Sequence, residues 1–207
     1  MNLEPLITAE QSPKTRGYRL GAREKTTSET RARILAATFD LATEQSRVQL
    51  VLADIAARGG VSVQTILRHF GTREGLFLAV LDYAGAEIEA ERDTPPGDIA
   101  RAVSTIVSHY ESRGDTVFRW LMQEFSSETA ARVTEQGKQV HRRWVETAFA
   151  PHLAPLVGEQ REASVDLLVV ATDLFTWKLL RRDRGLDRAT VESRILTLID
   201  LVLERPI

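Results

Sequence analysis

The sequence contains no cysteine among its 207 residues, and this absence removes several classes of function at once. Without thiols the chain can form no disulfide, no thiolate nucleophile and no cysteine-ligated zinc site. A chain without cysteine fits a reducing compartment, and we expect a cytoplasmic protein. The hydrophobic fraction of 43% is ordinary for a globular protein, so a sizeable core can form without covalent cross-links.

The chain also lacks long apolar runs and alternating patterns. Its most apolar stretches, 167–174 and 195–203, are far too short to cross a bilayer. No charged segment followed by an apolar core opens the chain, so we expect neither a secretory signal nor a membrane partner. Strand alternation and Asn-Gly hairpins are missing, whereas helical periodicity covers 98–112, 115–127, 128–149, 160–183 and 188–204. The sequence therefore predicts an all-α fold.

Patterns typical of catalysis and metal binding are missing as well. There is no Gly-rich phosphate loop and no nucleophile elbow. None of the histidines begins a His-x-x-x-His or Glu-x-x-His pair, and all four lie far apart, at His69, His109, His141 and His152. The carboxylates at positions 87, 89 and 91 are most simply a solvated helix end. We therefore expect no enzyme, no cofactor and no metal, although metal ligation from distant helices stays open.

Positive charge is unevenly distributed along the chain. The net charge is −2, yet residues 14–73 hold eleven Lys and Arg against five Asp and Glu, which leaves the rest of the chain acidic. A basic segment on an acidic protein is typical of a nucleic-acid-binding module joined to a second module. A solvated, charged N-terminus gives the same pattern, so charge alone leaves both interpretations open.

The first 25 residues show no sustained apolar period and contain two prolines and two glycines. We expect a flexible basic arm whose cations contact phosphates, namely Lys14, Arg16, Arg19, Arg23 and Lys25. Thr26-Thr27-Ser28-Glu29 then supplies a capping box, which predicts the start of a helix. The apolar stripe behind it includes Ile34 and Phe39.

A helix-turn-helix is predicted around Gly60-Val61-Ser62. A short apolar stripe through Leu52 and Ile55 stops at Gly60, which can take the left-handed conformation of a turn. Ser62 is a good N-cap for a second short helix that buries Ile66. Its outward positions are then Val63, Gln64, Thr65, Leu67 and Arg68. Such a helix enters the major groove of double-stranded DNA, although plain structural hairpins also contain glycine turns.

The residues around this turn resemble the TetR family of transcriptional repressors without a gap. The match runs over residues 31–81 and includes Arg31-Ala-Arg-Ile-Leu-Ala-Ala-Thr-Phe-Asp-Leu, Asp54-Ile-Ala-Ala, Gly60-Val-Ser, Thr65-Ile-Leu-Arg-His-Phe70 and Thr72-Arg-Glu-Gly-Leu76. The resemblance implies a three-helix DNA-binding domain over 26–72 and a connecting helix over 73–92. A helical ligand-binding and dimerisation domain over 93–207 would follow, with release of DNA on binding a small molecule.

The resemblance also implies individual DNA contacts. Thr65 and His69 look like backbone-contacting positions, and Arg73 replaces the lysine that usually meets a phosphate. The full predicted DNA-binding set is Lys25, Ser62, Val63, Gln64, Thr65, Leu67, Arg68, His69 and Arg73. Three positions depart from the family pattern, at Ser46, Val51 and Leu67, where the family usually has glycine, a phosphate-binding threonine and tyrosine.

The C-terminal half predicts a homodimer through its last two helices. Residues 166–180 are apolar nearly all round, which is typical of a helix buried on several sides. The last helix carries two apolar stripes, one through Val191, Ile195, Leu198 and Val202, the other through Leu196, Ile199 and Leu203. One stripe can face the chain's own core and the other a second copy, although one large intramolecular core would also use both.

Aromatic and polar side chains on the middle helices are candidates for lining a ligand pocket. They are Tyr110, Phe118, Leu121, Met122, Phe125, His141, Trp144, Val145, Phe149 and Trp177. Such a lining would suit a small hydrophobic ligand of unknown identity, although each residue could equally be core. The sequence thus predicts a ligand-responsive, DNA-binding regulator. A helical protein-interaction adaptor and an all-α enzyme are the alternatives, and the adaptor leaves the basic segment unexplained.

Overall fold

The computed structural model describes the backbone of residues 14–44 and 51–204, and the side chains of 25–44 and 51–204. This part of the chain contains helices and no strand, as predicted. Four helices form the N-terminal half: α1 (Lys14–Glu44), α2 (Leu52–Gly59), α3 (Val63–Phe70) and α4 (Arg73–Glu91). The C-terminal half comprises α5 (Ile99–Leu121), α6 (Glu128–Ala148), α7 (Ala150–Leu153), α8 (Gly158–Thr172), α9 (Leu174–Lys178), the π-helical turn η1 (Leu179–Asp183) and α10 (Arg188–Glu204).

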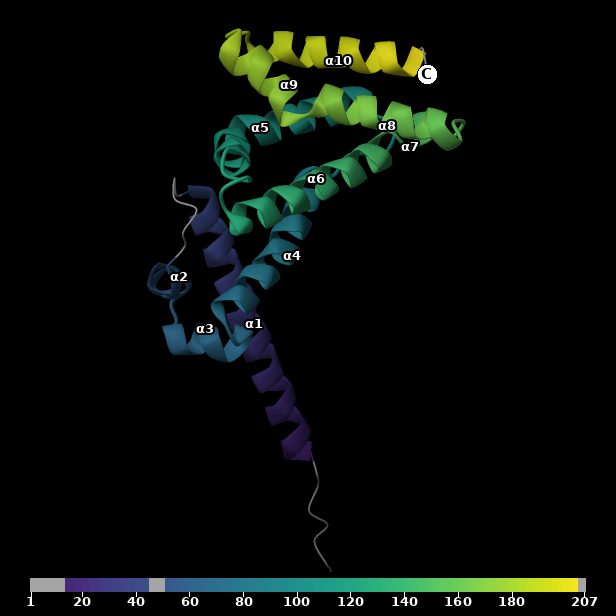
Figure 1. Cartoon of the computed structure of the whole chain (residues 1–207). Helices are drawn as coiled ribbons and strands as arrows, with labels where there is room; N and C mark the ends of the chain where they lie inside the picture. Colours follow the sequence, from purple (N-terminus) through teal and green to yellow (C-terminus); the bar gives the residue numbers. More distant parts are fainter. Residues whose placement is uncertain (1–13, 45–50, 205–207) are drawn as a thin grey trace, which may run out of the picture.

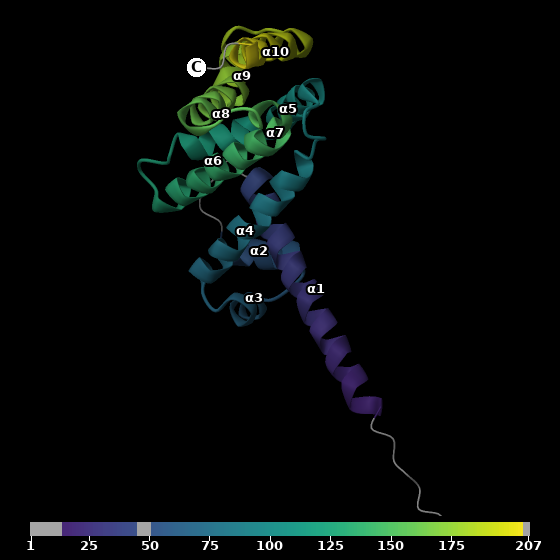
Figure 2. The same ribbon diagram turned by 90° about the vertical axis from the view of Figure 1, so that its right-hand side faces the viewer.

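The first helix is longer than predicted. α1 begins at Lys14 and runs through Thr26–Glu29, so the predicted capping box does not start a helix. The prediction of a flexible arm is therefore wrong for residues 14–25, while residues 1–13 lie outside the described part. An absent apolar stripe shows only that a segment lacks a packing partner, and extending an existing helix avoids the unfavourable nucleation step. The beginning of α1 accordingly extends away from the other helices (Figures 1 and 2).

Two apolar cores correspond to the two halves. The smaller core joins α1, α2, α3 and α4 through Ile34, Leu41, Ile55, Ala56, Ile66, Leu76 and Val80. The larger core lies among α5, α6, α8, α9 and α10, with Trp177, Phe149 and Leu168 among its most buried side chains. In Figure 1, α10 lies along the outer side of α8 and α5, at the end of the molecule opposite α3.

The halves are joined by α4 and by contacts of α1 with α5. α4 packs on α1 and α3 near its start and on α6 towards its end. Beside it, the Thr116 hydroxyl in α5 donates to the carbonyl of Thr43 at the end of α1, at 2.9 Å. The single helix α4 therefore connects the predicted helix-turn-helix with the helices of the larger core.

Two helix boundaries in the C-terminal half differ from prediction. Gly114 lies inside α5, where it does not end the helix; a Cβ atom there would lie 2.7 Å from Cζ3 of Trp177, so the glycine serves close packing. The predicted helix over 160–183 is divided at Asp173, whose extended backbone and carboxylate cap α9 by accepting from the Phe175 N–H at 2.8 Å.

The apolar faces of the last helices also differ from prediction. Within a single chain the segment 166–180 is not buried on every side, because Val170, Phe175 and Leu179 are each more than half exposed. Burial of these residues in a dimer stays a prediction. In α10 the buried stripe runs through Val191, Ile195 and Ile199, whereas Leu198 is exposed together with Leu201. Ile199 therefore belongs to the inner face, because a spacing of four residues keeps it in line with Ile195. No helix of the described residues is long and apolar enough to span a membrane.

Candidate DNA-binding site and the buried cluster behind it

The turn between α2 and α3 has the predicted geometry. Gly60 closes α2 in the left-handed conformation, with φ 62° and ψ 39°. This conformation lets the Val61 N–H donate to the carbonyl of Ala56 at 3.0 Å. The bond pairs one of the last carbonyls of α2, which have no partner within the helix. Ser62 then begins α3, because its hydroxyl accepts the Thr65 N–H at 3.1 Å. The three-residue turn of a helix-turn-helix is confirmed.

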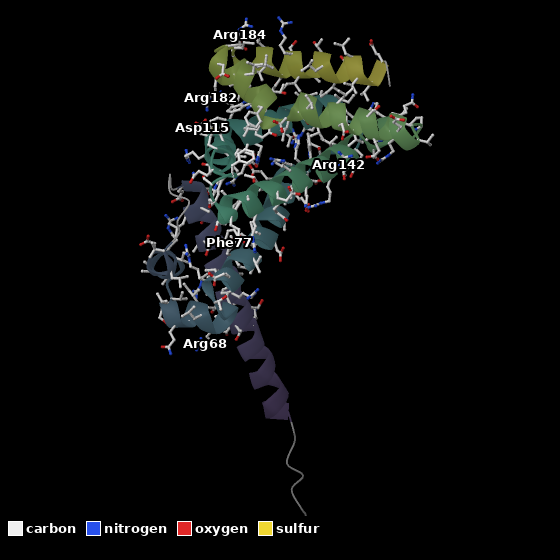
Figure 3. The ribbon with its side chains drawn as sticks, viewed as in Figure 1. Arg68, Phe77, Asp115, Arg142, Arg182 and Arg184 are labelled. Atoms are coloured by element: carbon white, nitrogen blue, oxygen red, sulfur yellow. The ribbon has the colours of Figure 1, made fainter. Side chains whose placement is uncertain are left out.

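The outer face of α3 carries most of the residues predicted to contact DNA. Ile66 is fully buried against α1 and α2, which fixes the rotation of the helix. That rotation exposes Gln64, Leu67 and Arg68, and leaves Val63, Thr65 and His69 half-buried. In Figure 3 the Arg68 side chain points away from the body of the protein. One open depression on this surface is lined by Ser62, Gln64, Thr65, Leu67 and Arg68.

Arg31 in α1 holds the C-terminal end of α3, a role not predicted from the sequence. Its Nη1 donates to the carbonyl of His69 at 3.2 Å, and its guanidinium carbon lies 4.3 Å from the centre of the Phe70 ring. A cation at this end also interacts favourably with the helix dipole. Partial burial lowers the pKa of His69, and Arg68 and Arg31 act in the same direction, so its imidazole is neutral near pH 7.

The junction between α3 and α4 requires a glycine. Thr72 caps α4 by accepting the Gly75 N–H at 2.9 Å. A Cβ atom at Gly75 would collide with the backbone carbonyl oxygen of Phe70, so α4 approaches the end of α3 too closely for any larger residue. The two helices are thereby held in one relative orientation.

The other predicted DNA contacts lie outside the depression on α3. Arg73 is exposed at the start of α4 and borders a small cavity between the two halves, together with Phe77 and Trp120. Lys25 is exposed on the extended part of α1. Val51 is the N-cap of α2 and makes no side-chain capping bond, which agrees with its lack of a hydroxyl. Ser46 lies outside the described residues.

The structure gathers only part of the predicted ligand-binding set. Tyr110, His141, Trp144, Val145, Phe149 and Trp177 are buried in the larger core, with Phe118 and Leu121 half-buried beside it. Met122 and Phe125 lie on the turn after α5, where Phe125 is 97% exposed. The prediction that these two residues line the interior is wrong, because α5 ends at Leu121 and the chain then turns outward.

Buried polar groups lie among these aromatic rings. Arg92, the residue that ends α4, is only 6% exposed, and His109 and His141 are as deeply buried. The carbonyl of Arg92 accepts the indole N–H of Trp144 at 2.9 Å, while Tyr110 donates its hydroxyl to the carbonyl of Thr172 at 3.1 Å. This set of side chains, Arg92, His109, Tyr110, His141, Trp144 and Thr172, is called the Arg92 cluster below. No described residues form a group of three or more side chains suited to a metal ion.

Comparison with known proteins identifies the family. The family model of bacterial regulatory proteins of the tetR family matches residues 34–80. The HTH-type transcriptional repressor Rv3405c of Mycobacterium tuberculosis is 31% identical over 185 residues, covering 84% of this chain and 87% of that protein. The HTH-type transcriptional regulator Mb3439c of Mycobacterium bovis matches to the same extent. The chain belongs to the TetR family.

A solved structure shows the same fold. A transcriptional regulator from Rhodococcus sp. Rha1 superimposes with a TM-score of 0.59 at 20% identity, over 84% of this chain and 96% of the other. The resemblance seen in residues 31–81 is thus confirmed, and the TetR-family chain is a DNA-binding transcriptional regulator whose α2–α3 hairpin is the helix-turn-helix.

Proposed function

We propose that this TetR-family chain is a homodimeric repressor that binds a palindromic operator and leaves it when a small hydrophobic ligand binds the C-terminal half. A relative that is 31% identical is named a transcriptional repressor. The observation that carries the proposal is the single helix α4. It starts against the recognition helix α3 and ends at Arg92, inside the aromatic cluster of the larger core.

Exposed apolar side chains on the last helices support the dimer. Val170, Phe175 and Leu179 follow one another along α8, α9 and η1, and Leu198 and Leu201 lie on the outer face of α10. Exposed apolar side chains on helices that pack together, as α8 and α10 do, are typical of a subunit interface. A two-fold dimer also has a functional reason, because it places two α3 helices on half-sites about 34–36 Å apart.

Release by a ligand requires two dimer conformations with different affinities for DNA. A ligand that binds more tightly to the conformation with wrongly spaced recognition helices lowers the population bound to DNA. α4 supports this coupling, because it is packed on α3 at one end and on α6 at the other. A shift at its C-terminal end is therefore transmitted to α3 as a movement of the whole helix.

Selection of bound fragments from fragmented genomic DNA tests the proposal. We expect the dimer to retain fragments that share an inverted repeat, and nuclease footprinting to show two protected half-sites. Binding measured by fluorescence anisotropy should fall when the cognate small molecule is added. Failure of the dimer to retain any fragment would favour the adaptor alternative and contradict operator binding.

Gln64 is expected to read bases, because it is exposed in the first turn of α3. Gln64→Ala should change which sequences are selected, with a loss of about 1–3 kcal/mol on the original operator. Arg101→Gln serves as a matched control, because Arg101 is an exposed polar residue in the other half. An unchanged preference profile for Gln64→Ala in a selection from random DNA would contradict the base-reading role.

A further inference from the structure

Arg92 is a buried cation without a carboxylate partner. Its side chain is 6% exposed, and none of the ion pairs among the described residues includes it. Its Nε atom is buried and makes no hydrogen bond. Burial lowers the pKa of Arg92, yet a guanidinium keeps its proton inside proteins. A full positive charge is therefore present inside the larger core.

The side chains that contact the Arg92 guanidinium, His141 and Tyr110, are neutral. Thr172 donates its hydroxyl proton to the carbonyl of Leu168 at 2.7 Å, so it accepts from Nε2 of His141 at 3.1 Å. This leaves Nδ1 of His141 as the acceptor for Nη1 of Arg92, at 3.4 Å. On the other side the guanidinium carbon lies 5.7 Å from the centre of the Tyr110 ring. Burial lowers the pKa of His141 to about 3, so this histidine adds no charge at pH 7.

The nearest carboxylates are engaged elsewhere. Glu91 lies 2.8 Å from Nε of Arg113 and 3.3 Å from Nδ1 of His109. Asp173 accepts the Phe175 N–H and caps α9. Both carboxylates favour the charged form of Arg92 through space, but neither forms an ion pair with it. An uncompensated buried charge is strongly destabilising, and an apolar side chain of similar volume is often more stable in such a place. A purely structural role therefore does not account for an arginine here.

We propose that the ligand is a small organic acid whose carboxylate pairs with the Arg92 guanidinium and whose apolar body packs on the aromatic rings of the Arg92 cluster. This inference rests on the proposed release by a ligand and names the chemical class of that ligand. A planar guanidinium binds a carboxylate through two parallel hydrogen bonds, and Nε is one of the donors that such a pair uses. The Tyr110 ring lies next to the guanidinium, the Trp144 ring stacks on His141, and the Trp177 ring lies 5.8 Å from that of Tyr110.

The position of Arg92 in the fold connects this pair to DNA binding. Arg92 caps the C-terminal end of α4, and its carbonyl is held by Trp144 and Thr94. An acid that draws the guanidinium towards itself acts on the end of α4, and the start of the same helix is fixed against α3. Binding of the acid and binding of DNA are then linked through one helix.

Matched acid and amide pairs test the inference, because each pair differs mainly in charge. The probes are benzoate and benzamide, phenylacetate and phenylacetamide, and octanoate and octanamide. Release of the full-length dimer from its selected operator is followed by fluorescence anisotropy, and stabilisation of the free dimer by thermal melting. We expect at least one acid to release DNA and raise the melting temperature at concentrations where its amide does neither.

Variants at Arg92 assign the effect to this side chain. Arg92→Met should bind the operator and melt at the wild-type temperature or above, because it removes an unpaired buried charge. It should respond to the acid about 30-fold more weakly or worse, the effect of removing one partner of a buried charge pair. Arg92→Lys keeps the charge and should respond in between. Arg101→Gln, on an exposed arginine of α5, should respond like the wild type.

The outcomes separate this inference from the proposed function. Equal responses to acid and amide, or an Arg92→Met variant as sensitive as the wild type, would overturn the carboxylate pair and leave ligand release standing. A wild-type dimer that binds its operator but neither melts higher nor dissociates with any of the three acids would overturn the acid as the ligand, whereas failure of the dimer to bind any operator would contradict the proposed function.

Discussion

The two halves of the molecule treat their polar side chains in opposite ways. On α3 the polar and charged residues Gln64 and Arg68 are exposed, and one short apolar face through Ile66 is buried. In the larger core, Arg92, His109 and His141 are enclosed by aromatic rings. The first arrangement leaves hydrogen-bonding groups free for a partner that arrives at the surface. The second holds groups whose burial destabilises the fold unless they are hydrogen-bonded or paired with an opposite charge, which a bound molecule can supply.

Acidification should affect the C-terminal half most. Burial lowers the pKa of His109 to about 4 and of His141 to about 3, both from an ordinary value of 6.5. At pH values between the lowered pKa of the folded protein and the ordinary 6.5, each histidine is protonated in the unfolded chain but neutral in the folded one. The free energy of unfolding therefore falls as the pH drops below 6.5. The loss should approach about 1.4 kcal/mol per pH unit for each histidine, down to about pH 4. Thermal melting from pH 7 to pH 4 measures it.

A double variant, His109→Gln with His141→Gln, should flatten this pH dependence while leaving DNA binding at pH 7 within a few-fold of the wild type. Glu91, Arg92 and Arg113 are the charged groups nearest these histidines and stay in place in the variant. A slope as steep as that of the wild type would show that groups outside the Arg92 cluster dominate acid unfolding.

Charge on the outer face of α10 should abolish dimerisation and, with it, operator binding. Leu198→Asp with Leu201→Asp places carboxylates on the exposed apolar face, and we expect at least a 100-fold weaker operator affinity, about 3 kcal/mol. Analytical ultracentrifugation measures the oligomeric state and anisotropy measures binding. Val157→Asp is the matched control, because Val157 is exposed at the N-cap of α8, where aspartate is favourable. A dimeric double variant would refute this interface.

A pair of glycines separates backbone crowding from helix propensity. Gly75→Ala forces a Cβ atom against the carbonyl oxygen of Phe70, and we expect a loss of about 2 kcal/mol together with weaker DNA binding, because α3 is displaced. Gly137→Ala meets no atom within 4 Å in the middle of α6 and should stabilise the protein by about 1 kcal/mol. Urea unfolding compares the two; equal effects would contradict the close approach of α4 to α3.

Arg73→Ala should have the smallest effect and the most specific signature. If Arg73 contacts a phosphate, its removal weakens binding to all sequences alike and reduces the salt dependence by about one phosphate contact. Titrations at several salt concentrations, on the operator and on an unrelated duplex, measure both quantities. The same slope as the wild type would exclude Arg73 from the phosphate contacts.

Much of the helix-turn-helix could be predicted from the sequence, because helix caps and turns depend on residues that are close together in the chain. Gly60, Ser62 and Thr72 act through backbone groups within a few residues, so their roles follow from position alone. The roles of Arg31 and Gly75 were not predicted, since each depends on a neighbouring helix: Arg31 reaches the end of α3, and Gly75 meets the carbonyl of Phe70.

The C-terminal half was less predictable because its signals are long-range. The sequence predicted a break between helices at Gly114. The glycine instead lies inside α5 and makes room for Trp177, which is more than sixty positions away. Phe125 was predicted to line a ligand pocket, yet its side chain is exposed on the turn after α5. The burial of Arg92 was not predicted, since nothing in the neighbouring residues shows that Tyr110, His141 and Trp144 will pack around it.

The sequence by itself therefore determined the helical architecture, the helix-turn-helix and the family, because helix periodicity, caps and turns are properties of neighbouring residues. Only the tertiary structure decided which face of α10 is buried, where α1 begins and which polar groups are enclosed. These features depend on the packing of segments that are distant in the sequence. The cost of burying a charge is set by this packing and not by the residues next to it in the chain. The burial of Arg92, from which we infer an acidic ligand, follows only from the tertiary structure.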